Sequence, residues 1–192
     1  MEVSILDSRL LRVTSQHLSI RPATSADVPF IFDLRRSERG QFLNSTDPDI
    51  ARQYEYFARY LERFDAGDEI YYVICDNHTN VKCGIFRLTR ITAAPKIGWE
   101  GLILNKSASP LVGIDICATV YEIAIFVLGR EELGPWSIKP NNRPMLRIHE
   151  YMNTAFEVQR DDESLWYSVK SEDYLRRREW LQRRGFGVIN NG

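Results

Sequence analysis

The stretch that decides the fold is LILNKSASPLVGIDICATVYEIAIFVLG, residues 102–129. It begins with an apolar segment that ends at Leu104, continues through a loop of small and polar residues, and enters a long apolar run after Pro110. These residue types predict a strand, a tight loop and a buried helix, with Ser109 as the N-cap. A helix that starts directly after a strand presents unpaired backbone N–H groups, which can hold a phosphate.

The same stretch has a second interpretation, because its loop contains no glycine before Gly113 and a Ser-Pro pair also starts many ordinary helices. In the phosphate interpretation, the anion is bound by the first backbone N–H groups of the helix, those of Leu111, Val112, Gly113 and Ile114. The charge of Asp115 must then point away from the anion. Taken alone, the stretch favours an ordinary capped helix.

The composition indicates one folded domain. The chain has 192 residues, of which 44% are apolar and 27% are charged. No repeat or Pro/Gly linker divides it, so we expect a single domain over residues 1–192, with a core at about 17–170 and a C-terminal helix at 171–185. Lys and Arg number 25 and Asp and Glu number 26, a balance that gives no electrostatic case for a nucleic-acid or membrane partner.

Three features predict a cytoplasmic protein without a bound metal. The N-terminal residues are too few and too polar for a signal peptide. The apolar run at 116–128 is shorter than a membrane span and contains Glu122. The cysteines lack the spacing of metal ligands and have the apolar neighbours of buried, reduced thiols: Cys75, Cys83 and Cys117.

The order of predicted elements indicates the fold class. Strands are expected at 17–22, 69–75, 81–91, 97–104, 133–138, 155–160 and 165–170, and helices at 25–36, 50–64, from 110 onward, 142–152 and 174–184. Three antiparallel strands feeding a β-α-β unit predict an α/β fold, with a mixed, mostly antiparallel sheet, one parallel pair and helices on both faces. The carboxyl ends of such a parallel pair can part and leave a crevice for a ligand.

A second motif lies in WSIKPNNRPMLRIHEYMNTAFEVQ, residues 136–159. The pattern predicts a strand, an Asn-Asn pair and then a helix. Asn142 lies near the helix start and His149 follows seven residues later, so the two share one side of the helix. Their ordinary structural roles are a helix cap for Asn142 and a partly buried, hydrogen-bonded imidazole for His149.

Together, these motifs resemble the GNAT superfamily of acyl-CoA-dependent N-acyltransferases over roughly residues 17–170. The resemblance rests on the element order, the apolar helix after the third hairpin-connected strand, and the Asn-x6-His helix. Within the superfamily, the chain looks most like the branch that acylates amino groups of nucleotide-linked sugars in bacterial surface-polysaccharide pathways. This finer resemblance rests on Leu34-Arg-Arg-Ser-Glu with Phe42-Leu-Asn, Ser107-Ala-Ser-Pro110 and Arg147-Ile-His-Glu150.

The chain departs from the superfamily in two places. The pyrophosphate loop of the superfamily usually reads Gln/Arg-x-x-Gly-x-Gly/Ala, and residues 107–113 lack this pattern. A tyrosine often stands where His149 stands. Backbone N–H groups can hold a pyrophosphate whatever the side chains are, and a histidine can also supply a proton.

The resemblance implies that acetyl-CoA or another acyl-CoA is the co-substrate and that no metal takes part. Backbone groups of Leu102, Ile103 and Leu104 are then expected to hold the acyl-pantetheine arm like an added strand. The helix start at Ser109 is expected to hold the pyrophosphate. Asn142 is expected to orient the pantetheine, and His149 to protonate the leaving thiolate.

The resemblance also implies a small-molecule amine as acceptor, most specifically the amino group of a nucleotide-linked amino sugar. Glu100, on the third strand of the hairpin series, is the candidate general base, with an ordinary surface carboxylate as the alternative. Arg35, Arg36 and Asn44 are candidates for binding an anionic acceptor, because arginine matches the geometry of phosphate. The alternative for the arginines is a solvated helix face.

Two other functions fit the sequence. The same fold could acylate a protein N-terminus or side chain, as ribosomal-protein acetyltransferases do. Alternatively, the chain could bind acyl-CoA without catalysis, which the unusual pyrophosphate loop favours. Trp166 and Tyr167 on the closing hairpin would also suit a homodimer interface, although core packing is the default for such residues.

Overall fold

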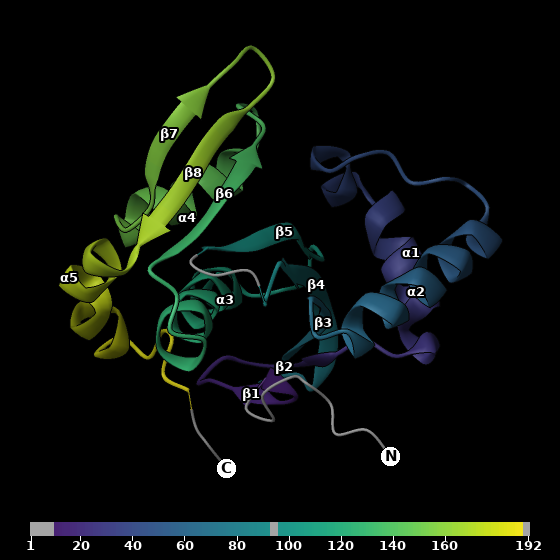
Figure 1. Cartoon of the computed structure of the whole chain (residues 1–192), viewed down its shortest axis with the longest axis horizontal. Helices are drawn as coiled ribbons and strands as arrows, with labels where there is room; N and C mark the ends of the chain where they lie inside the picture. Colours follow the sequence, from purple (N-terminus) through teal and green to yellow (C-terminus); the bar gives the residue numbers. More distant parts are fainter. Residues whose placement is uncertain (1–9, 93–95, 190–192) are drawn as a thin grey trace.

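The computed structural model describes residues 10–92 and 96–189. Eight strands form one mixed sheet in the order β1-β2-β3-β4-β5-β6-β8-β7. Helices α1 and α2 pack against one face of this sheet, and α3 and α4 lie on the other side (Figure 1). The predicted fold class, a mixed sheet with one parallel pair and helices on both faces, is therefore confirmed.

The strands are β1 (Val13–Thr14), β2 (Leu18–Pro22), β3 (Glu69–Asp76), β4 (Val81–Thr89), β5 (Lys96–Leu104), β6 (Glu132–Ile138), β7 (Phe156–Arg160) and β8 (Leu165–Lys170). The helices are α1 (Val28–Arg36), α2 (Ile50–Asp65), α3 (Pro110–Glu122), α4 (Arg143–Met152) and α5 (Ser171–Gln182). Two 3-10 helices, η2 (Ser25–Asp27) and η3 (Glu38–Phe42), flank α1, and a π-helical turn, η4 (Ile123–Val127), follows α3. Within residues 10–92 and 96–189, β1 and η3 are the elements that were not expected from the sequence, because both are too short to show a period.

The sheet is buried on both faces at its centre. Along β3, alternate side chains belong to two different apolar clusters, as the pleat of a strand requires. Ile70, Tyr72 and Ile74 pack with α3 in the larger cluster. Tyr71 and Val73 pack with α1 and α2 in the smaller one.

Helix α3 is the central helix of the larger cluster. The segment Pro110–Val127 has the length and apolarity of a membrane span, yet 72% of it is buried inside the structure. Ser109 caps the helix as predicted, with its side chain accepting the N–H of Leu111. The apolar run that opened the sequence analysis is therefore a core helix.

Asp115 joins two segments that are far apart in the sequence, 15–17 and residue 187, to α3. Its buried carboxylate accepts hydrogen bonds from Ser15 Oγ at 2.6 Å, from the His17 N–H at 3.0 Å and from the Gly187 N–H at 2.8 Å. Burial raises the pKa of Asp115, and these three hydrogen bonds offset part of that rise. The Asp115 carboxylate is therefore bonded within the protein and points away from the helix start, as the phosphate interpretation requires.

The parallel strands β5 and β6 pair over a very short length, only at Lys96 with Glu132 and Ile97 with Leu133. The next residues of β6 are Gly134 and Pro135. Proline has no N–H to donate to a sheet, and the register of β6 with β8 also shifts at this point. Beyond Leu133 the two parallel strands therefore diverge.

Strand β5 carries a bulge next to the divergence. Ile103 pairs with Ile85 and Glu100 pairs with Arg87, so two residues of β5 lie opposite one residue of β4. Gly101, inside the bulge, has a φ of 67°, a conformation that favours glycine. Because a bulge leaves an extra residue out of the ladder, it frees backbone groups here.

A buried carboxylate ties the start of α1 to the sheet. Asp27, 1% exposed, accepts hydrogen bonds from Arg21 at 2.7 and 2.9 Å, from Lys82 Nζ at 2.7 Å and from the Thr24 N–H at 2.9 Å. Burial alone would raise the pKa of Asp27, but the hydrogen bonds from Arg21 and Lys82 hold it well below its usual range. Asp27 is therefore ionised in the folded protein.

Replacing Asp27→Asn should lower the free energy of unfolding by about 2 kcal/mol at pH 7, because two cations lose their counter-charge and the helix start loses part of its cap. Because folding lowers the pKa of Asp27, its ionisation stabilises the fold at pH values above the pKa of the unfolded chain, which is near 4. This stabilisation is lost as the pH falls below that value. The difference between the two proteins should thus shrink by about 1 kcal/mol from pH 5 to pH 3. Urea unfolding at the two pH values measures it, and a difference independent of pH would contradict this account.

Candidate functional site

A cleft of about 510 Å³ opens where β5 and β6 diverge. Its walls come from β5, from β6 and the segment that follows it, from α1 and the segment 42–44, from the start of α4, and from the tip of the β7–β8 hairpin. Helix α1 lies on one face of the sheet and α4 on the other. The cleft is therefore bordered by elements from both faces.

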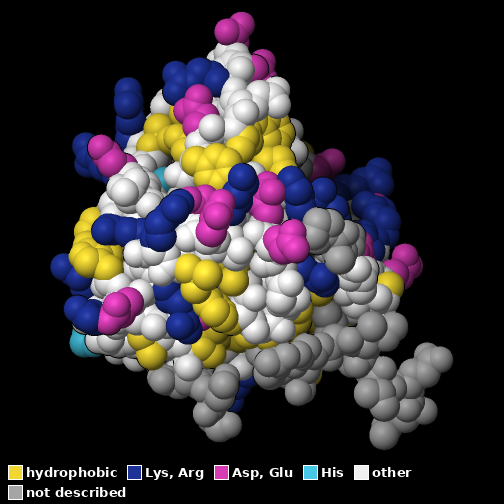
Figure 2. Space-filling view, turned by 60° about the vertical axis from the view of Figure 1, so that its left-hand side comes forward, with side chains coloured by type: hydrophobic (Ala, Val, Ile, Leu, Met, Phe, Trp, Pro, Cys, Tyr) yellow, Lys and Arg dark blue, Asp and Glu magenta, His cyan; other side chains and the backbone are white. Residues whose placement is uncertain are grey.

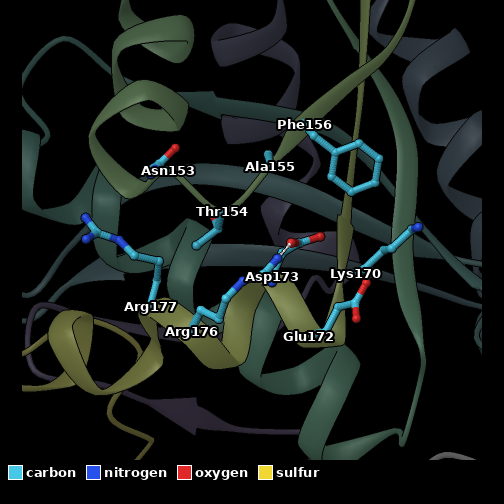
Figure 3. Close-up of a pocket in the computed structure, with 9 residues that line it drawn as sticks. All are labelled: Asn153, Thr154, Ala155, Phe156, Lys170, Glu172, Asp173, Arg176 and Arg177. Carbon is cyan, nitrogen blue, oxygen red and sulfur yellow. Dashed lines mark hydrogen bonds and ion pairs between the residues drawn. The ribbon is translucent and has the colours of Figure 1, made fainter.

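A second cavity, of about 620 Å³, lies between the end of α4, β7, β8 and α5 (Figure 3). The cations around it, Lys170, Arg176 and Arg177, stand beside the carboxylates of Glu172 and Asp173. Arg176 forms an ion pair with Asp173. None of the site residues predicted from the sequence lines this cavity, so we place the candidate site in the β5–β6 cleft.

The narrow end of the cleft, where β5 and β6 begin to part, is filled by aromatic rings. The rings of Trp99 on β5 and Trp136 on β6 are 4.9 Å apart between centroids, and both residues line the cleft. His149 lies 5.4 Å from Trp136, and Tyr121 lies 6.0 Å from Trp99. We call these four side chains the aromatic apex, and all four are buried.

His149 is enclosed within the aromatic apex rather than exposed to the cleft. It is 4% exposed, stacks on Tyr167 at 5.3 Å and has its Nδ1 atom 3.4 Å from the Tyr121 hydroxyl. Burial lowers the pKa of His149 to about 4, so its imidazole is neutral at pH 7. Among the described residues, His149 Nε2 and the indole nitrogens of Trp99 and Trp136 have no hydrogen-bond partner.

Glu100 lies on the wall of the cleft, on the sheet face that α1 and α2 cover. Its carboxylate accepts a hydrogen bond from Arg87 Nη2 at 2.7 Å, and its side chain is 50% exposed. Arg87 also contacts Glu69 at 3.3 Å and the Tyr56 hydroxyl. The position of Glu100 is thus fixed by a partly buried network while one side of it faces solvent.

At the start of α3, part of the predicted phosphate seat is already bonded within the protein. The Leu111 N–H donates to Ser109 Oγ at 3.2 Å, and the Val112 N–H donates to the Ser109 carbonyl at 3.0 Å. A Cβ atom on Gly113 would lie 3.1 Å from Cδ1 of Ile148, so this glycine lets α3 and α4 pack closely. Leu111 is 44% exposed and marks the side from which a ligand can approach.

The remaining donor-side residues lie along β5 and at the start of α4. Asn142 caps α4, with its Oδ1 atom accepting the Met145 N–H at 3.4 Å, and both residues line the cleft. Leu102 also lines the cleft, whereas Ile103 is buried toward α1 and α2 and Leu104 packs against the larger cluster. The structure thus brings Asn142 and the bulge of β5 to the same opening.

Two of the three predicted acceptor residues lie in the cleft. Arg35 lines it and donates from Nε to Thr46 Oγ1 at 2.9 Å and from Nη2 to the Asn44 carbonyl at 3.3 Å. Asn44 lines the cleft as well. The guanidinium of Arg36 instead lies over the Phe32 ring, 5.1 Å from its centroid, and Arg36 is not among the residues that line the cleft.

Several cleft residues were missed by the sequence analysis. Trp99 and Trp136 could have been found, because each follows the start of one of the two predicted parallel strands by two to four residues. Glu163, Ser164 and Trp166 come from the β7–β8 hairpin, and only the tertiary placement of that hairpin brings them to the cleft.

Charges of both signs are interspersed on the face of the molecule shown in Figure 2, with small separate apolar patches between them. That face therefore offers no extended basic surface of the kind that binds nucleic acid. Among residues 10–92 and 96–189, no group of three or more His, Cys, Asp or Glu side chains is arranged to hold a metal ion.

Comparisons with solved structures place this fold. The chain is similar to apo FdhC, described as a nucleotide-linked sugar GNAT, with a TM-score of 0.76 and 23% identity over 90% of this chain and 97% of that one. It is similar to Mycobacterium smegmatis RimJ in complex with CoA-disulfide, with a TM-score of 0.71 and 12% identity over 91% and 94% of the two chains. It is also similar to Vibrio cholerae spermidine N-acetyltransferase in complex with CoA and spermine, with a TM-score of 0.69 and 13% identity over 83% and 98%.

No model of a known protein family matches the chain, and no curated protein matches its sequence. At these identities, the structural likeness shows the fold. The chain therefore has the GNAT fold, and the resemblance that the sequence indicated is confirmed at that level.

The burial of His149 makes stability depend on pH in a predictable direction. Because its pKa falls from about 6.5 in the unfolded chain to about 4 in the fold, the unfolded state takes up a proton first as the pH drops. This term should cost about 2–3 kcal/mol of stability between pH 7 and pH 4.5. His149→Phe should remove it, whereas the same change at the exposed His78 should not.

Urea unfolding of the three proteins at pH 7 and pH 4.5 tests this prediction. If the His149→Phe variant loses as much stability on acidification as the unmodified protein, the imidazole is not held neutral by burial.

Proposed function

We propose that the chain is an acyl-CoA-dependent N-acyltransferase whose donor and acceptor meet in the β5–β6 cleft. The observation that carries this proposal is that the cleft is bordered from both faces of the sheet. Asn142 and Met145 border it from the α4 side, and Arg35 and Asn44 border it from the α1 side. Two substrates can therefore approach from opposite directions and react directly, which gains rate by holding the reacting groups together.

The donor is proposed to lie along the free edge of β5. Because β6 turns away after Leu133, no strand of the described part of the chain pairs with this edge of β5 at residues 102–104. The pantetheine arm contains amide groups, so it can pair with this edge like an added strand. Its pyrophosphate would then reach the start of α3 at Ser109, where the helix dipole favours negative charge.

The proposed reaction is attack by a neutral amine on the thioester carbonyl carbon. Glu100 takes the proton that the amine loses, directly or through a water molecule. A backbone N–H of the bulge at Gly101 stabilises the oxyanion of the tetrahedral intermediate. The carbon–sulfur bond then breaks, giving an amide and a CoA thiolate that takes up a proton to become the free thiol.

The structure changes the role that we propose for His149. Its side chain is buried behind Trp99 and Trp136 and is not among the residues that line the cleft, so in this arrangement it does not reach the departing sulfur. The acid role predicted for His149 is therefore not carried into the proposed mechanism. We propose that His149 supports the two indole rings from behind, and that the thiolate takes up its proton from water in the cleft.

For the acceptor, we propose the amino group of a nucleotide-linked amino sugar. Arg35 and Lys139 line the cleft and can face a diphosphate, while Phe42 and Trp166 offer planar surfaces to a base or sugar ring. FdhC, whose fold this chain shares, is described as a nucleotide-linked sugar GNAT, which supports the same choice.

A cationic amine is the second candidate acceptor. Glu100 and Glu163 also line the cleft, and two carboxylates suit a polyamine or the amino terminus of a peptide. The Vibrio cholerae spermidine N-acetyltransferase and RimJ have the same fold.

The single domain, the cytoplasmic location and the homodimer stay predictions.

An acceptor screen tests the function. The purified chain is incubated with acetyl-CoA and, in turn, nucleotide-linked amino sugars, spermidine and short peptides, with thiol release and product mass as readouts. We expect kcat/KM to be at least tenfold higher for a nucleotide-linked amino sugar. Preference for spermidine or a peptide would show that the acceptor is a cationic amine. Binding of acetyl-CoA without any thiol release would indicate a non-catalytic acyl-CoA-binding protein.

The neighbouring arginines of α1 give a matched pair of variants. Arg35→Ala should raise KM for a nucleotide-linked acceptor about tenfold, because one charge-assisted contact to phosphate is worth roughly 1.5–3 kcal/mol. Arg36→Ala should change it less than twofold, since Arg36 is stacked on Phe32 away from the cleft. Equal effects of the two changes in steady-state assays would argue against an anionic acceptor at Arg35.

The phosphate seat can be tested at Leu111, which is exposed, without disturbing the core. Leu111→Glu should raise the apparent KM for acetyl-CoA about tenfold through charge repulsion, and Leu111→Lys should leave it unchanged or lower it. Calorimetric titration with CoA should show the same order. Identical affinities for the two variants would place the pyrophosphate elsewhere.

A further inference from the structure

We infer that Trp99 and Trp136 set the length of the acyl group and restrict the donor to a short acyl chain, best matched by acetyl. This inference rests on the proposed function, because it concerns the acyl group that the proposed reaction transfers. It adds two residues for which the sequence predicted no role, and it names the class of donor.

The first step of the argument is position. In the proposed reaction the thioester carbonyl lies between the pantetheine on β5 and the amine on the α1 side, and the bulge at Gly101 is where β5 frees its backbone. Trp99 precedes that bulge by two residues, and Trp136 stands across the divergence on β6. An acyl chain that extends from the carbonyl toward the narrow end of the cleft therefore meets these two rings first.

The second step is that the rings close the cleft. Their centroids are 4.9 Å apart, with the ring planes tilted by 57°, and the two residues are 2% and 7% exposed. Two rings in contact leave no channel for an alkyl chain between them. The cleft thus ends at Trp99 and Trp136 instead of continuing into the larger apolar cluster.

The third step is that the rings cannot move aside. Tyr121 and His149 pack behind them with 0% and 4% exposure, and Tyr174 packs behind Tyr121 at 5.4 Å. On the other side, a Cβ atom on Gly134 would lie 3.0 Å from Cε3 of Trp136, so the indole rests directly on the backbone. Close-packed interiors make little room for added methylene groups.

The consequence is a steep dependence of rate on acyl length. The methyl group of acetyl ends within the open part of the cleft, whereas each further methylene must displace a packed ring. A hydrophobic pocket discriminates between substrates that differ by one methylene by roughly 10- to 200-fold. We expect kcat/KM to fall at least tenfold from acetyl-CoA to butyryl-CoA and further with hexanoyl-CoA.

The decisive variant is Trp136→Ala, with Trp136→Leu as a milder change that keeps an apolar side chain. Each should raise the ratio of kcat/KM for hexanoyl-CoA to that for acetyl-CoA at least tenfold, with the larger effect for alanine. Trp180→Ala is the control, because Trp180 lies on α5 and does not line the cleft or belong to the aromatic apex. It should leave this ratio within twofold of the unmodified protein.

The readouts separate failure of this inference from failure of the proposed function. If the unmodified protein uses hexanoyl-CoA as well as acetyl-CoA, or if Trp136→Leu leaves the ratio unchanged, the inference is wrong while the acyltransferase stands. If no amine is acylated by any donor, the proposed function fails. Calorimetry then still tests whether Trp99 and Trp136 limit acyl length. The inference predicts at least tenfold weaker binding of hexanoyl-CoA than of acetyl-CoA to the unmodified protein.

Discussion

The structure depends on one short contact, the parallel pairing of β5 with β6 over two residue pairs. Gly134 and Pro135 follow directly, and because proline cannot donate to a sheet, β6 leaves β5 at this point and continues beside β8. This single interruption creates the cleft, frees one edge of β5 beside a bulge, and brings the tip of the β7–β8 hairpin to the opening. The rest of the sheet is an antiparallel scaffold that holds the two diverging strands in place.

The divergence of β5 and β6 also determines how charged and apolar residues are distributed along the cleft. Its narrow end is closed by buried rings, and burial there keeps His149 neutral at pH 7, as the lowering of its pKa to about 4 indicates. Its open end carries charges of both signs, with Glu100 fixed by Arg87 and with Arg35 and Lys139 on the walls. A cleft with an apolar, close-packed narrow end and a charged open end suits a reaction that transfers a small apolar acyl group to a polar acceptor.

The sequence was sufficient for the fold because its signals are local. Buried strands, the capped apolar helix after Ser109 and the amphipathic pattern of α4 each leave a periodic trace, and their order alone predicts the parallel pair. The site was predicted less completely, because it depends on how elements pack. Arg35 and Arg36 are indistinguishable in sequence, yet one lines the cleft and the other stacks on Phe32. Likewise, nothing local indicates that His149 lies behind Trp136 or that the tip of the β7–β8 hairpin lines the cleft.

The most direct test of this account is a crystal structure of the protein with CoA. The account predicts that the pantetheine lies against residues 102–104 of β5, that the sulfur atom lies in the cleft near Gly101 and Asn142, and that the pyrophosphate lies at the start of α3. CoA bound in the cavity beside α5, or with its thiol outside the β5–β6 divergence, would contradict it.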